Sequence, residues 1–110
     1  MTSDTEKKAQ YLKKKIENMN AQELEEYLDD ALEHSFNINS NGTYHSCEIV
    51  IEFGGPGSII ETRKKGLTVL WGTDIHFINL CEETLEMIDK IMELNWKMTL
   101  FNLFNELKTN

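Results

Sequence analysis

Apolar residues near the start of the chain recur at helical spacing. Between residues 5 and 19, Ala9, Leu12, Ile16 and Met19 follow one another at intervals of three and four, which predicts a helix with one apolar face. Five lysines fill most of the remaining faces. We interpret them as a solvated surface, and the alternative is a basic patch for a nucleic acid or an acidic partner.

A second helix is expected directly after the first. Asn20 and Glu23 have the spacing of a capping box, and the helical pattern then continues to about His34. The predicted apolar stripe of this helix consists of Leu24, Leu28, Ala31 and Leu32. Helices are therefore expected over about residues 5–34.

The middle of the chain changes to strand patterns after an Asn-rich loop at residues 36–42. Residues 44–53 alternate strictly. The predicted core face of this strand consists of His45, Cys47, Ile49, Ile51 and Phe53. Three more strands, joined by short turns, are expected at residues 58–64, 67–71 and 75–80. Such short connections predict a four-stranded antiparallel meander over about residues 44–80, with helices packed on one face.

The C-terminal segment is predicted to be helical from residue 82 to about residue 108, since it contains neither Pro nor Gly. Beyond Leu94 it is apolar on nearly every side, which is typical of a buried or interface helix. Either a break near Asn95 folds a helix pair over the sheet, or the tail packs on another chain. The candidate dimer interface consists of Trp96, Leu100, Phe101 and Phe104. We expect a single α+β domain over residues 1–110.

Composition limits the possible functions. The chain has 110 residues, 19 acidic and 11 basic, with a net charge of −8. This balance argues against binding duplex DNA or an anionic membrane surface, which both require cations. No apolar run could span a bilayer, and the N-terminus does not resemble a signal peptide, so we expect a cytoplasmic protein. Cys47 and Cys81 are then expected as free, buried thiols, with a single disulfide as the alternative.

No motif indicates catalysis. The stretch Gly54–Gly57 (GGPG) precedes a strand rather than a helix, so it is interpreted as a turn and not as a phosphate loop. His45 with Cys47, and His76 with Cys81, lack the spacing of a zinc site and lack a third group that would orient a nucleophilic pair. We therefore predict no enzyme, no metal and no cofactor.

The distribution of acidic residues is the one unusual feature. No Lys or Arg occurs from Ile16 to Thr62, whereas ten carboxylates do, several with the same sign at i,i+4 spacing. The candidate partner-binding residues are Glu23, Glu25, Glu26, Asp29, Asp30, Glu33, Glu48, Glu52 and Glu61. This acid either only keeps the protein in solution, or forms a surface that mimics nucleic acid and binds a cationic site on another protein.

A resemblance points to the second interpretation. The segments EIVIEFGGPGSIIET, GLTVLWGTD and LCEETLEMIDKI, within about residues 48–92, are similar to small acidic proteins of bacteriophages and mobile elements. The order of helix, meander and helix with surplus acid also resembles small anti-CRISPR proteins. The resemblance implies a phage-type inhibitor in the host cytoplasm that binds a nucleic-acid-handling protein, above all a CRISPR effector. The alternative is a homodimeric structural or adaptor protein whose interface is the C-terminal helix.

Overall fold

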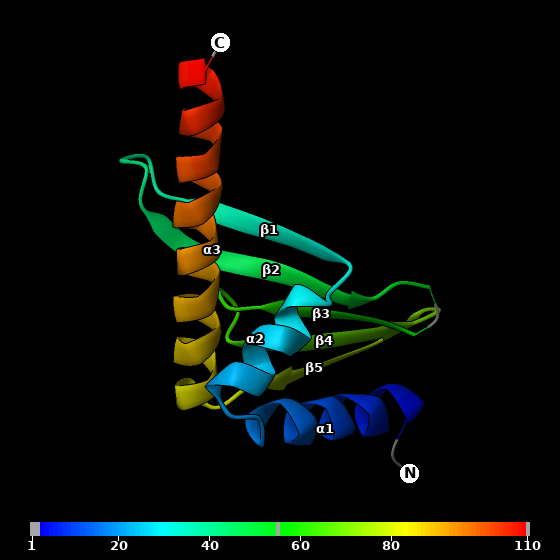
Figure 1. Ribbon diagram of the computed structural model, residues 1–110. Coiled ribbons are helices and arrows are strands. Elements are labelled where there is room, and N and C mark those ends of the chain that lie inside the picture. The colour runs from blue at the N-terminus through cyan, green and yellow to red at the C-terminus, as the bar shows by residue number, and fades with distance from the viewer. Residues whose placement is uncertain (1–2, 55, 110) are drawn as a thin grey trace.

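A computed structural model describes residues 3–54 and 56–109 and confirms the α+β class. Two helices precede a five-stranded sheet, and one long helix follows it (Figure 1). In chain order the elements are α1 (Asp4–Glu17), α2 (Ala21–Asp29), β1 (Glu33–Ile38), β2 (Tyr44–Glu52), β3 (Gly57–Glu61), β4 (Gly66–Trp71), β5 (Asp74–Asn79) and α3 (Glu82–Thr109).

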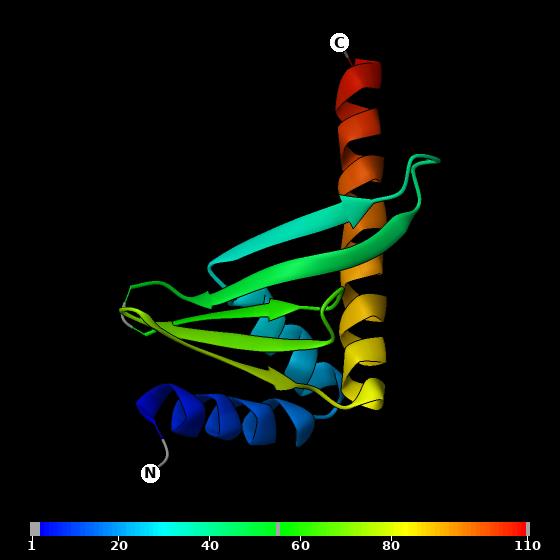
Figure 2. The ribbon, with the colours of Figure 1, turned by 180° about the vertical axis from the view of Figure 1, so that it is seen from behind.

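The sheet is an antiparallel meander in the order β1-β2-β3-β4-β5, and helices cover one of its faces. Figure 2 shows the other face, which no helix crosses. The core lies between the sheet and the helices, as an antiparallel sheet with one solvated face allows. Its buried residues include Ala9, Leu12 and Ile16 of α1, Leu24 and Leu28 of α2, Cys47, Ile49, Ile60, Leu67 and Val69 of the strands, and Leu85, Ile88 and Met92 of α3.

The predicted capping box at the start of α2 is confirmed. The side chain of Asn20 accepts a hydrogen bond from the Glu23 backbone N–H at 2.8 Å, and the Glu23 carboxylate accepts one from the Asn20 backbone N–H at 3.0 Å. Two N–H groups that have no partner within the helix are thereby satisfied.

The predicted extent of α2 is wrong, and one strand escaped prediction. The helix ends at Asp29 rather than His34, and residues 33–38 form β1, which pairs along its whole length with β2. His34 faces α2 from this strand, with Nε2 at 2.6 Å from the backbone oxygen of Leu28. Leu32, placed in the apolar stripe, is exposed. Pairing with β2 outweighs the weak helical pattern of these residues.

The predicted core face of β2 is correct only at its centre. Cys47 and Ile49 are buried, but His45 and Phe53 are exposed and Ser46 is buried. The register between β1 and β2 shifts at Asn37/Ile38, which interrupts the alternation near His45, and Phe53 lies beyond the end of the strand. In the turn that follows, Gly54 has φ +91°, as a turn glycine can; Gly55 lies outside the described residues.

One unbroken helix, α3, forms the C-terminal segment, so the alternative with a break near Asn95 is wrong. It has 28 residues and therefore a length of about 42 Å. Figure 1 shows its first half crossing the sheet and its second half extending beyond β1. The radius of gyration is 15.5 Å, against about 13 Å for a compact chain of this size, because half of this helix extends away from the domain.

Candidate interaction surfaces

The part of α3 beyond the sheet is highly apolar and exposed. We call residues 97–108 the overhang. Its exposed apolar side chains are Met98, Leu100, Phe101, Leu103, Phe104 and Leu107, with exposures from 41% to 69%. At about 200 Å² for a full side chain, they leave on the order of 700 Å² uncovered. A typical monomer exposes no apolar patch larger than about 300–600 Å², so this surface is typical of an interaction site.

One side of α3 carries a continuous line of residues from the core into the overhang. We call this line the seam: Leu85, Asp89, Met92, Trp96, Leu100, Leu103 and Leu107, at intervals of three and four. Its first part contacts the sheet, because Asp89 Oδ1 accepts a hydrogen bond of 2.6 Å from the Tyr44 hydroxyl on β2. The Trp96 ring lies 5.7 Å from the Phe36 ring on β1. Beyond β1, Leu100, Leu103 and Leu107 on this side of the helix are exposed.

The four residues predicted for a dimer interface do not share one side of α3. Trp96 is half-buried against Phe36, and Leu100 follows it along the seam. Phe101 and Phe104 are 67% and 64% exposed and lie on other sides of the helix. Leu94, Met98, Leu103 and Leu107, which were outside the predicted set, are equally exposed. In the sequence, these residues belong to a helix that is apolar on every side, and this pattern does not indicate which side forms an interface.

The outer face of α2 carries the other candidate surface. Glu25, Glu26, Asp29 and Asp30 are all exposed, and none forms an ion pair with residues 3–54 or 56–109. Glu23 also lies on this helix but is engaged in the capping box. Glu33, predicted to extend the helical row, is instead an exposed residue of β1.

The strand carboxylates do not form one surface. Glu48 and Glu61 are directly opposite each other on the uncovered face, and Lys64 neutralises Glu61 at 3.0 Å. A bulge between Val50 and Glu52 places Glu52 opposite Ser58 on the helix-covered face. There it forms an ion pair with Lys8 of α1 at 3.2 Å. The prediction that Glu52 joins Glu48 on a wet face is therefore wrong, because a bulge reverses strand alternation.

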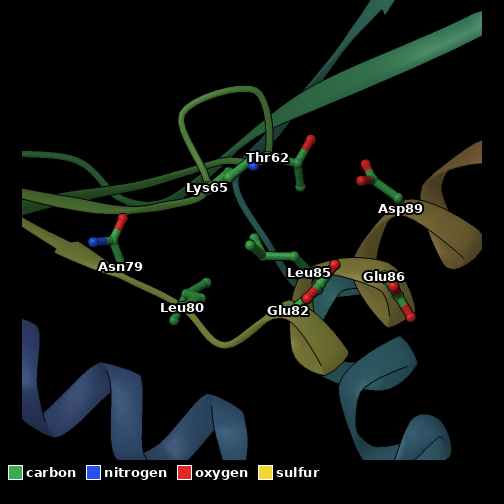
Figure 3. Close-up of a pocket in the computed structure, with 8 residues that line it drawn as sticks. All are labelled: Thr62, Lys65, Asn79, Leu80, Glu82, Leu85, Glu86 and Asp89. Carbon is green, nitrogen blue, oxygen red and sulfur yellow. The ribbon is translucent and has the colours of Figure 1, made fainter.

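A hollow of about 360 Å³ lies between the β3–β4 turn, the end of β5 and the first turns of α3 (Figure 3). It is lined by Thr62, Lys65, Asn79, Leu80, Glu82, Leu85, Glu86 and Asp89. The carboxylates come from one helix, and that of Asp89 is already bound to Tyr44. Within the described residues, no group of three or more His, Cys, Asp or Glu side chains is arranged to hold a metal ion.

The chemically reactive side chains near this hollow are poorly placed for catalysis. Burial raises the pKa of the Cys47 thiol, so the thiol is protonated near neutral pH and is a weak nucleophile. Burial, with the neighbouring Asp89, also raises the pKa of Tyr44. His45 is exposed and thus does not converge with Cys47. Cys81, predicted to be buried, is exposed, and both cysteines are free, so the disulfide alternative is wrong.

Comparison of the chain with protein-family models, with curated proteins and with solved structures found no match in any of the three. The resemblance of residues 48–92 to phage proteins therefore gains no support from relatives and stays a prediction. Among the described residues, no helix combines the length and the apolar character that crossing a membrane requires.

Proposed function

We propose that this chain is a non-catalytic protein-binding module and that the overhang of α3 is its binding element. The observation that carries this proposal is the exposed apolar surface of the overhang, on the order of 700 Å². It approaches the roughly 800 Å² that each partner contributes to a standard protein–protein interface.

The composition of the overhang also favours binding. Residues 97–108 contain only three charged side chains, Lys97, Glu106 and Lys108, in a chain of net charge −8. Depletion of charge together with aromatic and Met side chains is characteristic of interface cores. An isolated helical segment of 12 residues is also marginal in water, so a partner that covers this segment would stabilise its helical form.

A second candidate function is supported by α2. Its like-charged pairs Glu25/Asp29 and Glu26/Asp30 stand at i,i+4 spacing, and each such pair costs the helix on the order of 0.2–0.5 kcal/mol. A cationic nucleic-acid-binding surface on another protein would relieve this repulsion. The chain would then act as an inhibitor that mimics nucleic acid, and the resemblance to anti-CRISPR proteins would make a CRISPR effector the partner.

Two variants separate these functions in an affinity pull-down from bacterial lysate. The first, Leu100→Glu with Phe104→Glu, changes only exposed residues of the overhang. The second neutralises α2 by Glu25→Gln, Glu26→Gln, Asp29→Asn and Asp30→Asn. Circular dichroism verifies that each variant keeps its fold.

We expect the overhang variant to lose bound protein and the α2 variant to keep it. If only the α2 variant loses bound protein, and moderate salt abolishes binding by the wild type, the inhibitor is favoured instead. Salt screening weakens exposed charge pairs. Capture that both variants retain would refute both functions.

A further inference from the structure

Resting on the proposed function, we infer that the overhang binds a second copy of this chain, and that the two copies join their sheets edge to edge through β1. The joined sheet has ten strands, twice the five of one chain. Each overhang then lies over the β1 edge of the other copy. Four features of the fold lead to this arrangement.

One edge of the sheet is covered by a helix, whereas the other edge is open in the described chain. Helix α1 covers the β5 edge, where Lys13 Nζ donates a hydrogen bond of 2.6 Å to the backbone oxygen of Asn79. The Thr5 hydroxyl donates one of 2.7 Å to Asp74 at the other end of β5. At the opposite edge, the only strand partner of β1 in the described chain is β2. Strand β1 contains no Lys or Pro, the residues that commonly prevent edge pairing, and it is therefore free to pair.

The seam indicates what lies beyond that edge. Trp96 marks the point where the seam contacts β1, through Phe36, and the seam continues as three exposed leucines at positions 100, 103 and 107. Twelve residues of helix extend about 18 Å, and neighbouring strands are about 4.8 Å apart. The overhang is therefore long enough to cover three further strands. Of these, β1 of a second copy would bring its half-buried Phe36 beneath these leucines, whereas Cys47, Ile49 and Ile60 of β2 and β3 are already buried under that copy's own helices.

A second copy can supply those strands with correct pairing. Antiparallel pairing of two β1 strands about Ser35 keeps all helices on one side of the joined sheet. It sets Glu33 opposite Asn37 and His34 opposite Phe36 of the second copy, so no like charges face each other. The two α3 helices then run antiparallel, side by side, over the joined sheet. Such an overhang contacts both the β1 edge and a helix, which explains why it is apolar on more than one side.

Charge also favours the overhang and β1 over the outer face of α2 as the surface through which two copies meet. The overhang has two cations and one anion, whereas the rest of the chain carries the whole excess of acid. A two-fold interface brings identical surfaces together, and like charges across an interface cost several kcal/mol. The region around β1 and the overhang can therefore meet itself, while the outer face of α2 cannot.

Cross-linking at the proposed axis tests the register. Ser35 would stand opposite Ser35 of the second copy with a Cα–Cα distance of about 4.5–5.5 Å, which a disulfide can bridge. The variant Ser35→Cys is made in a Cys81→Ser background, which removes the exposed native thiol. Ser40→Cys in the same background is the control, since Ser40 lies in the β1–β2 loop and is also exposed. We expect mild oxidation to produce covalent dimers of the first variant and not of the control.

Light scattering of the purified protein tests association itself. We expect twice the mass of one chain at micromolar concentration. Ser35→Glu, which sets two charges face to face, should raise the dissociation constant at least tenfold, while the control Ser40→Glu leaves it unchanged. Leu100→Glu with Leu103→Glu should also yield monomers.

The possible results are distinct. A monomeric wild type would overturn the second copy as partner, yet the overhang could still capture another protein in the pull-down, so the proposed function would stand. Dimers that depend on the leucines but tolerate Ser35→Glu and fail to cross-link would overturn the joining of the sheets. Dimers that survive both sets of changes would refute the inference, and the pull-down would then decide separately whether the overhang binds another protein.

Discussion

Removing the overhang should leave the domain intact while abolishing its self-association. A chain that ends at Lys97 keeps the Trp96–Phe36 contact and every residue of the buried core, whose last member along α3 is Met92. The removed side chains from residue 98 to residue 108 are all exposed in one chain. Changes at such surfaces usually alter the free energy of unfolding by at most about 0.5 kcal/mol.

The full chain should respond differently to protein concentration. If unfolding is coupled to dissociation of a dimer, each tenfold rise in concentration adds about 1.4 kcal/mol to the free energy of unfolding per dimer. Urea denaturation followed by circular dichroism over a hundredfold concentration range measures this shift. The shortened chain should show the same midpoint at every concentration.

Full-length protein with Leu100→Glu and Leu103→Glu is the control, because it keeps the helix and loses only the exposed seam. It should behave like the shortened chain. If truncation instead lowers the unfolding free energy by several kcal/mol at every concentration, the overhang packs on its own domain and the argument from exposure fails. A midpoint of the full chain that does not vary with concentration would contradict self-association.

Two further predictions concern the domain itself. Gly66→Ala should destabilise it by about 2 kcal/mol or more in urea denaturation, because the new Cβ would collide with the Ile78 backbone oxygen. The control Gly57→Ala meets only ordinary contacts of 3.5 Å and should cost far less. Equal effects of the two changes would contradict this reasoning. Burial opposes ionisation of Glu17, but hydrogen bonds from Lys13 and from the Cys81 backbone N–H outweigh it and hold its pKa below the ordinary 4.5. The stability that Glu17 contributes is present above pH 4.5 and is lost as pH falls through the lower pKa of the folded state. Glu17→Gln should therefore flatten the acid side of a profile of unfolding free energy against pH. An unchanged profile would refute this role of Glu17.

The sequence predicted those elements whose pattern and end signals agree. The helix of Ala9, Leu12 and Ile16 has its apolar face buried as predicted, and the cap of α2 has both of its expected hydrogen bonds. The three turns that follow β2, β3 and β4 gave the antiparallel order directly, since such short connections permit no other neighbours. Local signals sufficed at these places because no distant contact opposes them.

Strand β1 could not be predicted because its signal is not local. The segment EHSFNI has only two large apolar residues, and the helical pattern that includes Leu28 continues into its first residues. It becomes a strand through its pairing with β2, which no window of the sequence reveals. The bulge that places Glu52 on the other face of the sheet is also not apparent from the sequence. The predicted acidic surface therefore combined residues that lie on opposite faces. The overhang was recognisable as apolar, but its projection beyond β1 depended on a strand that was missed.

Whether the second edge of the sheet is covered decides if an open β1 edge leads to a dimer or to aggregation. An apolar helix beside an unpaired strand would lead to aggregation if pairing could repeat, because each added chain would offer a new edge. Here the other edge of the sheet is closed by α1 through Lys13 and Thr5, so a two-fold pairing through β1 uses the one edge that remains. The acidic faces of α2 then stay on the outside of both copies, where their repulsion opposes further association. The apolar overhang and the acidic α2 are thus compatible in one small protein: the first would hold two copies together, and the second would limit the assembly to two.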